Sequence, residues 1–172
     1  MRTIRTATLT ALLVAAFVAP GAAAAAMPAA SLHRIAVDGT FHGDGGYELG
    51  CDTVYVTGSG TFDSPGLGRG TYRFRVCLTI GGPTYPLVGA MTLTPNHGGT
   101  ISGSIKSVYT PGDGFVLPVV IAGGTRPFAH AQGTLTMGPF VESHFTNCDP
   151  RGPCLNWKDA GPITGTITHV AS

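Results

Sequence analysis

The sequence predicts an all-β protein of eight to nine antiparallel strands in meander order, folded as a sandwich or closed into a β-barrel. The first observation is composition: the 172 residues include 26 glycines and 13 prolines, and few of the residue types that build helices. The second is the spacing of short Thr- and Val-rich runs between turn residues. The third is an apolar face that continues from each run to the next, as in a sheet that folds over a partner sheet or closes into a barrel.

Residues 1–26 are expected to be an export signal and not part of the fold. Two arginines precede the apolar stretch 7–18, and a run of alanines follows it. The small residues at the end of that run favour cleavage before Met27, with cleavage after Ala30 as the alternative. The apolar stretch is too short for a permanent membrane anchor. We therefore expect a secreted protein with a single barrel domain, residues 27–172.

Loss of this signal changes the charge balance. The full chain has 10 Lys and Arg against 9 Asp and Glu, and without Arg2 and Arg5 the balance is 8 against 9, a net charge of −1. This charge gives no basis for binding nucleic acid or an anionic membrane surface.

The first predicted hairpin also pairs two cysteines. The runs 50–57 and 69–80 flank a turn signal, and a register centred near Ser64 places Cys51 opposite Cys77. This register gathers apolar side chains on one face, which a shift by one residue would scramble. We predict a Cys51–Cys77 disulfide, which suits an oxidising compartment.

The remaining cysteines, Cys148 and Cys154, are then expected to pair around their own short loop. No metal site is expected, because the cysteines lack Cys-x-x-Cys spacing and the six histidines are scattered along the chain.

The meander continues through the runs 86–94, 101–109 and 115–122. Registers built on the turns between them pair Ile80 with Leu87, Leu93 with Ile101 and Ile105 with Val119. The apolar face that results is the expected lining of a lumen, although a barrel can also place such a face in a subunit interface. The lining residues are Val54, Val56, Tyr72, Phe74, Val76, Met91, Leu93, Ile105, Val119 and Phe128.

The run 115–122 looks apolar on both faces. Val116 and Val120 lie on its outer face, which indicates a cover such as a subunit interface or the N-terminal segment. Pro118 cannot donate to a ladder, so a bulge or an unpaired side is expected there.

The stretch 119–136 joins the meander to the closing strands. Gly123-Gly124 permits a sharp reversal, Thr125 is a plausible N-cap, and a single helical turn is expected over 126–130. Phe128 is the one large apolar side chain on that turn, so we expect it to plug one end of the barrel.

This stretch resembles the signature of dirigent proteins and of the related allene oxide cyclase-like barrels. The matching residues are Gly123, Gly124, Thr125, Phe128, Ala131 and Gly133, with Arg126 where the family usually has a third glycine. The resemblance implies an eight-stranded barrel with an apolar cavity, commonly a trimer, which would cover Val116 and Val120. Dirigent proteins steer the coupling of phenoxy radicals, and allene oxide cyclases close a ring in a fatty-acid epoxide. Neither needs a cofactor, so none is expected.

After this turn we expect strands over 131–138, 140–146 and 163–170, the last returning to close the barrel against the first strand, 32–42. Asp44-Gly45-Gly46 is expected to be a turn. The long connection 147–162 carries the single tryptophan, Trp157, either as a lid or recognition surface or as a pinned loop.

The candidate catalytic residues to check are Glu142, His144 and Arg75; none is assigned a role. Glu142 and His144 alternate onto one face of their strand, where Thr134 and Thr136 would be neighbours. If that face is luminal, the two form an acid/base pair; otherwise it is the solvated face of an edge strand.

Three functions compete. The first is a barrel that binds a small apolar or aromatic ligand in its lumen. The second is a cofactor-free cyclase or coupling-directing enzyme, which requires an ionisable group inside the lumen. The third is a cell-surface or protein-binding module that acts through the loop Cys148–Trp157, which requires an exposed Trp157.

Overall fold

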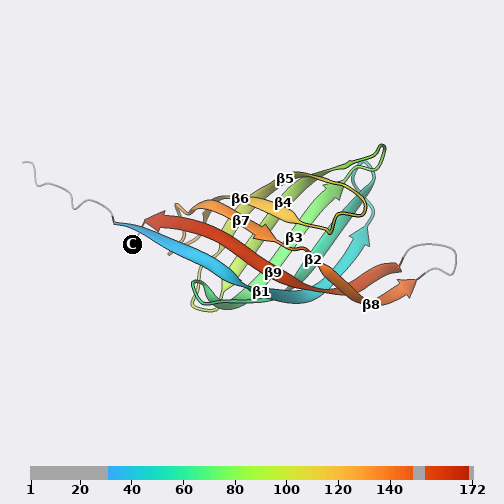
Figure 1. The fold of residues 1–172 in the computed structure, drawn as a ribbon. Coiled ribbons are helices and arrows are strands. Elements are labelled where there is room, and N and C mark those ends of the chain that lie inside the picture. Colours follow the sequence, from blue (N-terminus) through green and yellow to red (C-terminus); the bar gives the residue numbers. More distant parts are fainter. Residues whose placement is uncertain (1–30, 149–153, 171–172) are drawn as a thin grey trace, which may run out of the picture.

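The protein is described by a computed structural model over residues 31–148 and 154–170 (Figure 1). The expected export signal lies outside these ranges. Every regular element within them is a strand, as the composition predicts. No helix in the described ranges is long and apolar enough to cross a membrane.

The described strands are nine in number. They are β1 (Leu32–Glu48), β2 (Val54–Ser64), β3 (Gly68–Leu78), β4 (Tyr85–Pro95), β5 (Ile101–Tyr109), β6 (Leu117–Gly124), β7 (Gln132–Met137), β8 (Val141–Cys148) and β9 (Cys154–Val170).

The strands form one antiparallel sheet that closes on itself. Strands β1 to β7 pair in chain order, β9 follows β7, and a pairing between β1 and β9 closes an eight-stranded barrel. The ninth strand, β8, pairs with the first part of β9 beyond the end of β7. The barrel and its meander order are therefore confirmed, with β8 as an extra strand.

The pairing of β1 with β9, which we call the seam, is longer than the sequence predicts. It runs from Leu32 opposite Val170 to Gly46 opposite Asn156, and Figure 1 shows the two strands side by side along the barrel. The prediction of a turn at 44–46 is wrong, because this segment belongs to β1. The prediction of a loop over 147–162 is wrong for most of its length, because β9 begins at Cys154.

The turn prediction failed because the glycine at position 45 faces a large side chain on β9. Gly45 is the register partner of Trp157, and a Cβ added at Gly45 would overlap the indole ring. The glycine therefore gives a large side chain on the opposite strand room to lie across the sheet, and does not turn the chain.

Two of the predicted registers are confirmed and two are displaced. Leu93 lies opposite Ile101 and Ile105 opposite Val119, as expected. In the first hairpin Val54 faces Leu78 and not Phe74, because the tight turn lies between Ser64 and Gly68 instead of around Ser64.

In the second hairpin Leu87 pairs with Leu78, two residues from the expected Ile80. Both displacements are even numbers of residues, so every side chain stays on its predicted face.

The Cys51–Cys77 disulfide is confirmed, although the register that predicted it is wrong. The two Cα atoms are 6.0 Å apart. Cys77 pairs in the ladder with Tyr55, and Cys51 reaches it from the bend that precedes β2. Cys148 and Cys154 are register partners in β8 and β9. The Cys154 side chain lies outside the described part of the structure, so the second disulfide stays a prediction.

The segment 125–131, between β6 and β7, forms two successive reverse turns instead of the expected helical turn. The Phe128 amide donates to the Thr125 carbonyl at 2.7 Å, and the Ala131 amide donates to the Phe128 carbonyl at 2.9 Å. The Thr125 hydroxyl accepts a hydrogen bond from the Thr100 amide at 2.9 Å, so it ties the turn to the start of β5 instead of capping a helix.

Phe128 is 2% exposed and lies at one end of the barrel. Its ring contacts His97 of the β4–β5 turn and His169 near the end of β9, with centroids 6.0 and 5.3 Å away. We call this the closed end.

Strand β6 has apolar side chains on both faces, but its outer face is open in the single chain. Val120 is 58% exposed. Pro118 lies beyond the last β5–β6 pair, which is Ile105 with Val119. It therefore has no partner on β5, as the second of the two predicted alternatives states. The β5–β6 irregularity lies elsewhere, between Ser102 and Gly103.

Candidate functional site

The end of the barrel opposite Phe128 is open. Here β1, β3 and β5 end and β2, β4 and β9 begin. An apolar cavity of about 580 Å³ lies at this end, which we call the mouth cavity. Its lining residues are Tyr47, Glu48, Leu49, Val54, Leu78, Ile80, Tyr85, Tyr109 and Leu155.

Three tyrosines form much of the cavity wall, and each is held by another ring. Tyr85 and Tyr109 are register partners in β4 and β5, with ring centroids 6.2 Å apart. Tyr47 packs against the buried indole of Trp157 at 4.8 Å. Aromatic cross-strand pairs of this kind stabilise a sheet and fix ring positions. The wall is therefore largely formed without a ligand.

The rim of the mouth cavity is aliphatic and faces solvent. Leu49 is 89% exposed, Ile80 51% and Leu155 48%. Single exposed apolar residues are ordinary, but here three surround one apolar cavity. Such a concentration is typical of a binding surface.

Below the mouth cavity the barrel is filled with side chains. Phe140 packs against Phe41, Phe74 and Phe115, with centroids 4.7, 5.7 and 5.2 Å away. Phe115 in turn contacts Tyr109 of the cavity wall at 5.6 Å. A continuous aromatic cluster thus connects the core to the mouth.

All ten residues expected to line a lumen point into the barrel, but they form its packed core. Nine are fully buried, and Val54 is half-buried at the mouth. Val54 alone among them lines the mouth cavity. The sequence therefore located the interior, whereas the space for a ligand lies at the barrel end.

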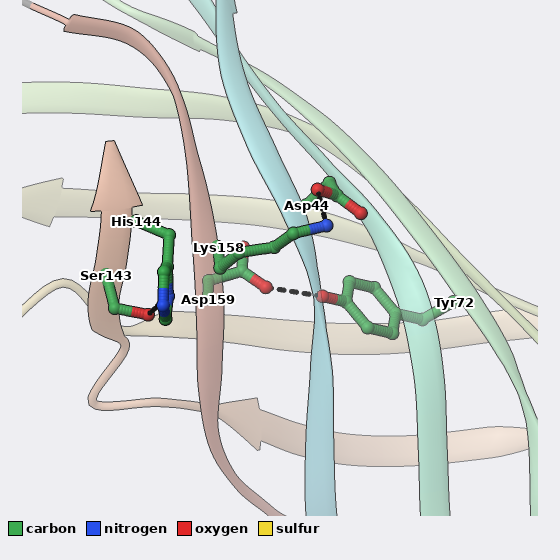
Figure 2. A network of polar contacts seen from close by, with 6 residues as sticks. All are labelled: Asp44, Tyr72, Ser143, His144, Lys158 and Asp159. Carbon is green, nitrogen blue, oxygen red and sulfur yellow. Dashed lines mark hydrogen bonds and ion pairs between the residues drawn. The ribbon is translucent and has the colours of Figure 1, made fainter. Parts of the chain in front are cut away.

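One carboxylate lies inside the barrel, at Asp159 of β9. It is 3% exposed and accepts a hydrogen bond of 2.8 Å from the Tyr72 hydroxyl (Figure 2). Its second oxygen, Oδ2, is buried and has no hydrogen-bond partner among the described residues. The neighbouring Lys158 points the other way and forms an ion pair with Asp44 on the exposed side of the seam.

Burial determines the protonation of this pair. Desolvation raises the pKa of Asp159, and Asp44 raises it further, against the lowering effects of the Tyr72 hydrogen bond and of Lys158. Burial and the adjacent carboxylate raise the pKa of Tyr72 well above its ordinary value. The pair is thus an acid that holds its proton more tightly than an exposed aspartate does.

Glu142 lies beside this acid at the mouth. It is the register partner of Asp159 across β8 and β9, so the two carboxylates share a face of the sheet. The Glu142 side chain is exposed, and partial desolvation, followed by Asp159, raises its pKa. Burial, followed by Glu142 and Tyr109, raises the pKa of Tyr47. Glu142 thus lies on the solvated face of an edge strand, which is the second of the two alternatives that the sequence left open.

The other candidate catalytic residues lie elsewhere. His144 has a φ of 50°, at an irregularity in β8, and contacts the Ser143 hydroxyl at 3.1 Å (Figure 2). This kink breaks the alternation that would place His144 on the face of Glu142. Arg75 is on the outer wall, 3.2 Å from Glu48 and stacked on Tyr55.

The expected neighbours Thr134 and Thr136 are separated from Glu142 by a whole strand. Both pair with residues of β9, because β9 lies between β7 and β8. Adjacency in the chain predicted the wrong strand pair here.

Asp159 is absent from the sequence-based candidates, and Trp157 was a candidate only as an exposed loop residue, because their segment was expected to be a loop. Both face Gly45 and Gly43 of β1 across the seam. One signal could have placed both side chains inside the barrel. Glycines alternate along one segment, at Gly43 and Gly45, and Trp157 and Asp159 alternate in the same way along the other.

The described residues contain no group of three or more side chains suited to hold a metal ion. No family model, curated protein or solved structure matches the chain.

Proposed function

We propose that the protein binds a small apolar or aromatic molecule in the mouth cavity. The observation that carries this proposal is an apolar cavity of about 580 Å³ with an aromatic wall and an exposed aliphatic rim. Ligand sites for small molecules have volumes of about 300–1,000 Å³ and few polar groups. The three tyrosine rings favour a flat or ring-containing ligand, which they can contact face to edge.

A neutral environment-sensitive dye, N-phenyl-1-naphthylamine, tests the cavity directly. The double variant Leu49→Asp/Leu155→Asp places two charges on the rim and should weaken dye binding at least about tenfold, because apolar area is lost and charge must be desolvated. Val88→Asp, on the outer wall at 57% exposure, is the matched control. Equal affinity in the rim variant and the control, or no dye binding at millimolar dye, contradicts the proposal.

A second candidate function is a cofactor-free cyclase or coupling-directing enzyme on the same scaffold. The observation in its favour is the Tyr72–Asp159 pair, an ionisable group inside the barrel. A neutral carboxyl there would donate a hydrogen bond to an oxygen of a bound substrate. Asp159 is not among the residues that line the mouth cavity, so catalysis additionally requires a movement that opens the cavity to Asp159.

Ligands recovered from the native protein separate the two functions. Under the enzyme hypothesis, incubation with fresh protein changes the chromatographic retention of such a ligand at constant mass, as an isomerisation does, and Asp159→Asn stops the change. Unchanged retention with retained binding leaves the binding function alone.

The third hypothesis loses its basis, because Trp157 is 5% exposed and packs in the core. The loop presents no tryptophan to a partner.

Membership of the allene oxide cyclase-like and dirigent-like barrels is part of the proposal, supported by the eight-stranded barrel and by the motif around Phe128. Secretion is proposed with it, and a disulfide is compatible with that location.

We also propose that the outer face of β6 at Val120, together with the half-buried Val116 just before the strand, forms the interface of a homotrimer. Sedimentation analysis should give a trimer that Val120→Glu dissociates and Val141→Glu, on β8, does not. A monomer at micromolar concentration contradicts it.

A further inference from the structure

The seam brings together two histidines from opposite ends of the chain. His33 of β1 and His169 of β9 are register partners, and their ring centroids are 5.8 Å apart. His33 is exposed and His169 is half-buried. Nothing in the spacing of histidines along the sequence indicates this pair, because only the closure of the barrel creates it.

The spacing of the two rings suits a shared metal ion. A first-row divalent ion binds an imidazole nitrogen at about 2.0–2.1 Å. Two imidazoles on one ion therefore have ring centroids about 4.5–6 Å apart, depending on the angle at the metal. The observed separation lies in this range, so the two strands already hold both rings at a distance that one ion can bridge.

The second ring nitrogen of His169 is already oriented. Its Nδ1 lies 3.3 Å from the Val170 carbonyl oxygen, which can only accept, so Nδ1 is the donor. The proton then sits on Nδ1 and the lone pair on Nε2, which leaves Nε2 available to a metal ion. Ligating histidines are commonly held in this way, by a carbonyl behind the ring.

We propose that His33 and His169 form a two-imidazole site for a borderline divalent transition-metal ion, with Cu²⁺ bound most tightly. Nitrogen ligands favour Cu²⁺ over Ni²⁺ and Zn²⁺ in the usual order of stability. Two protein ligands leave the other coordination positions to water, because the exposed side of the pair is open to solvent. A metal ion bound here would therefore exchange readily with the solution. A site with only two protein ligands is compatible with the finding that the described residues contain no group of three or more metal-binding side chains.

Metal bound here would join the first strand to the last at the closed end. His169 also packs against the ring of Phe128, so the ion would lie beside the barrel plug. Because the site exists only when β1 and β9 are paired, metal binding should stabilise the closed barrel against unfolding.

The test is a Cu²⁺ titration of the chain from Met27 to Ser172 without a polyhistidine tag. This start is chosen because a free amine at Ser31 would itself bind copper together with His33. Calorimetry gives the stoichiometry and affinity, and electron paramagnetic resonance counts the coordinated nitrogens. Wild type should bind one Cu²⁺ through two imidazoles.

The variants His33→Gln and His169→Gln should each weaken Cu²⁺ binding at least about tenfold, since even partners behind a ligand change affinity by 10–100-fold. His42→Gln is the matched control: it is exposed on the same strand, with Thr61 and Ala160 as its register partners. At a hundredfold excess of Cu²⁺ over Kd, Tm should rise by roughly 5–10 °C in wild type and in the control only.

Equal affinity in wild type and in both pair variants overturns the proposal, as does a spectrum with a single nitrogen ligand. A Cu²⁺-induced decrease in Tm overturns the coupling to barrel closure.

Discussion

The two ends of this barrel are built from the same strands but are completed differently. At the closed end, the β6–β7 connection folds inward and Phe128 fills the opening at 2% exposure. At the open end the connections carry Leu49 and Ile80, which remain 89% and 51% exposed around a cavity. Alternation along the strands fills the middle of a barrel. The connections decide whether an end is sealed or left available to a ligand.

The ends also differ in how they are held together. The closed end depends on apolar packing around one ring. The open end, which lacks such a plug, has the Cys51–Cys77 disulfide and the close packing of Trp157 on Gly45. Each of these stabilising interactions can be removed by a separate mutation, and the expected loss of stability differs among them.

Phe128→Ala should be the most destabilising, by about 3–5 kcal/mol in the free energy of unfolding, because it leaves a large cavity in the closed end. Denaturant titration followed by circular dichroism measures this. Phe145→Ala is the control, since Phe145 is 51% exposed on β8 and should change stability by less than about 0.5 kcal/mol. Similar values for the two variants would mean that Phe128 does not plug the barrel.

The double variant Cys51→Ala/Cys77→Ala should lose about 2–4 kcal/mol, because the crosslink restricts the unfolded chain over a sequence separation of 26. The loss should appear when both proteins are oxidised, and wild type and variant should unfold alike when both are reduced. If dithiothreitol leaves wild-type stability unchanged, the open end does not depend on this bond.

Gly45→Ala should cost about 1–3 kcal/mol, because the new methyl group overlaps the indole of Trp157. Its neighbour Gly46 provides a matched control: a Cβ there would lie 2.9 Å from the flexible Asn156 amide, which can move. Trp157 is the single tryptophan, so its fluorescence should shift to the red in Gly45→Ala only. A red shift in both variants would assign the effect to the strand instead of the indole contact.

The smallest expected effect is the pH dependence of the free energy of unfolding that comes from Asp159. The folded protein holds the Asp159 proton to higher pH than the unfolded chain does, because burial raises this pKa. The resulting stability is complete below the unfolded pKa of about 3.9 and is lost as pH rises through the folded pKa. The free energy of unfolding should therefore fall with pH above about 4, and less steeply in Asp159→Asn than in wild type. Asp38→Asn, exposed on β1, should keep the wild-type slope.

The comparison of the ends also shows what sequence reasoning can reach. Side-chain parity predicted the interior correctly even where two registers were displaced, because an even displacement preserves the face. Phe128 was placed as a plug from its position on a Gly-bounded turn, although that turn is not helical.

The open end was missed for a physical reason. Its glycines at 44–46 have the same local signature whether they turn the chain or lie beneath a tryptophan from a distant strand. Only the seam, formed between residues far apart in the sequence, separates these cases. The location of Asp159 and the His33–His169 pair depend on the same seam, so neither could be read from local pattern.

The seam has one more consequence, for the order of events in folding. Strands β2 to β7 each pair with a neighbour in the chain, so they can form hairpin by hairpin. β1 finds one of its two partners only when β9 is present, and closing so long a loop is entropically slow. Until then both edges of the sheet expose unpaired amides and carbonyls. A chain still emerging from synthesis would therefore remain an open sheet, and closure would be the last step.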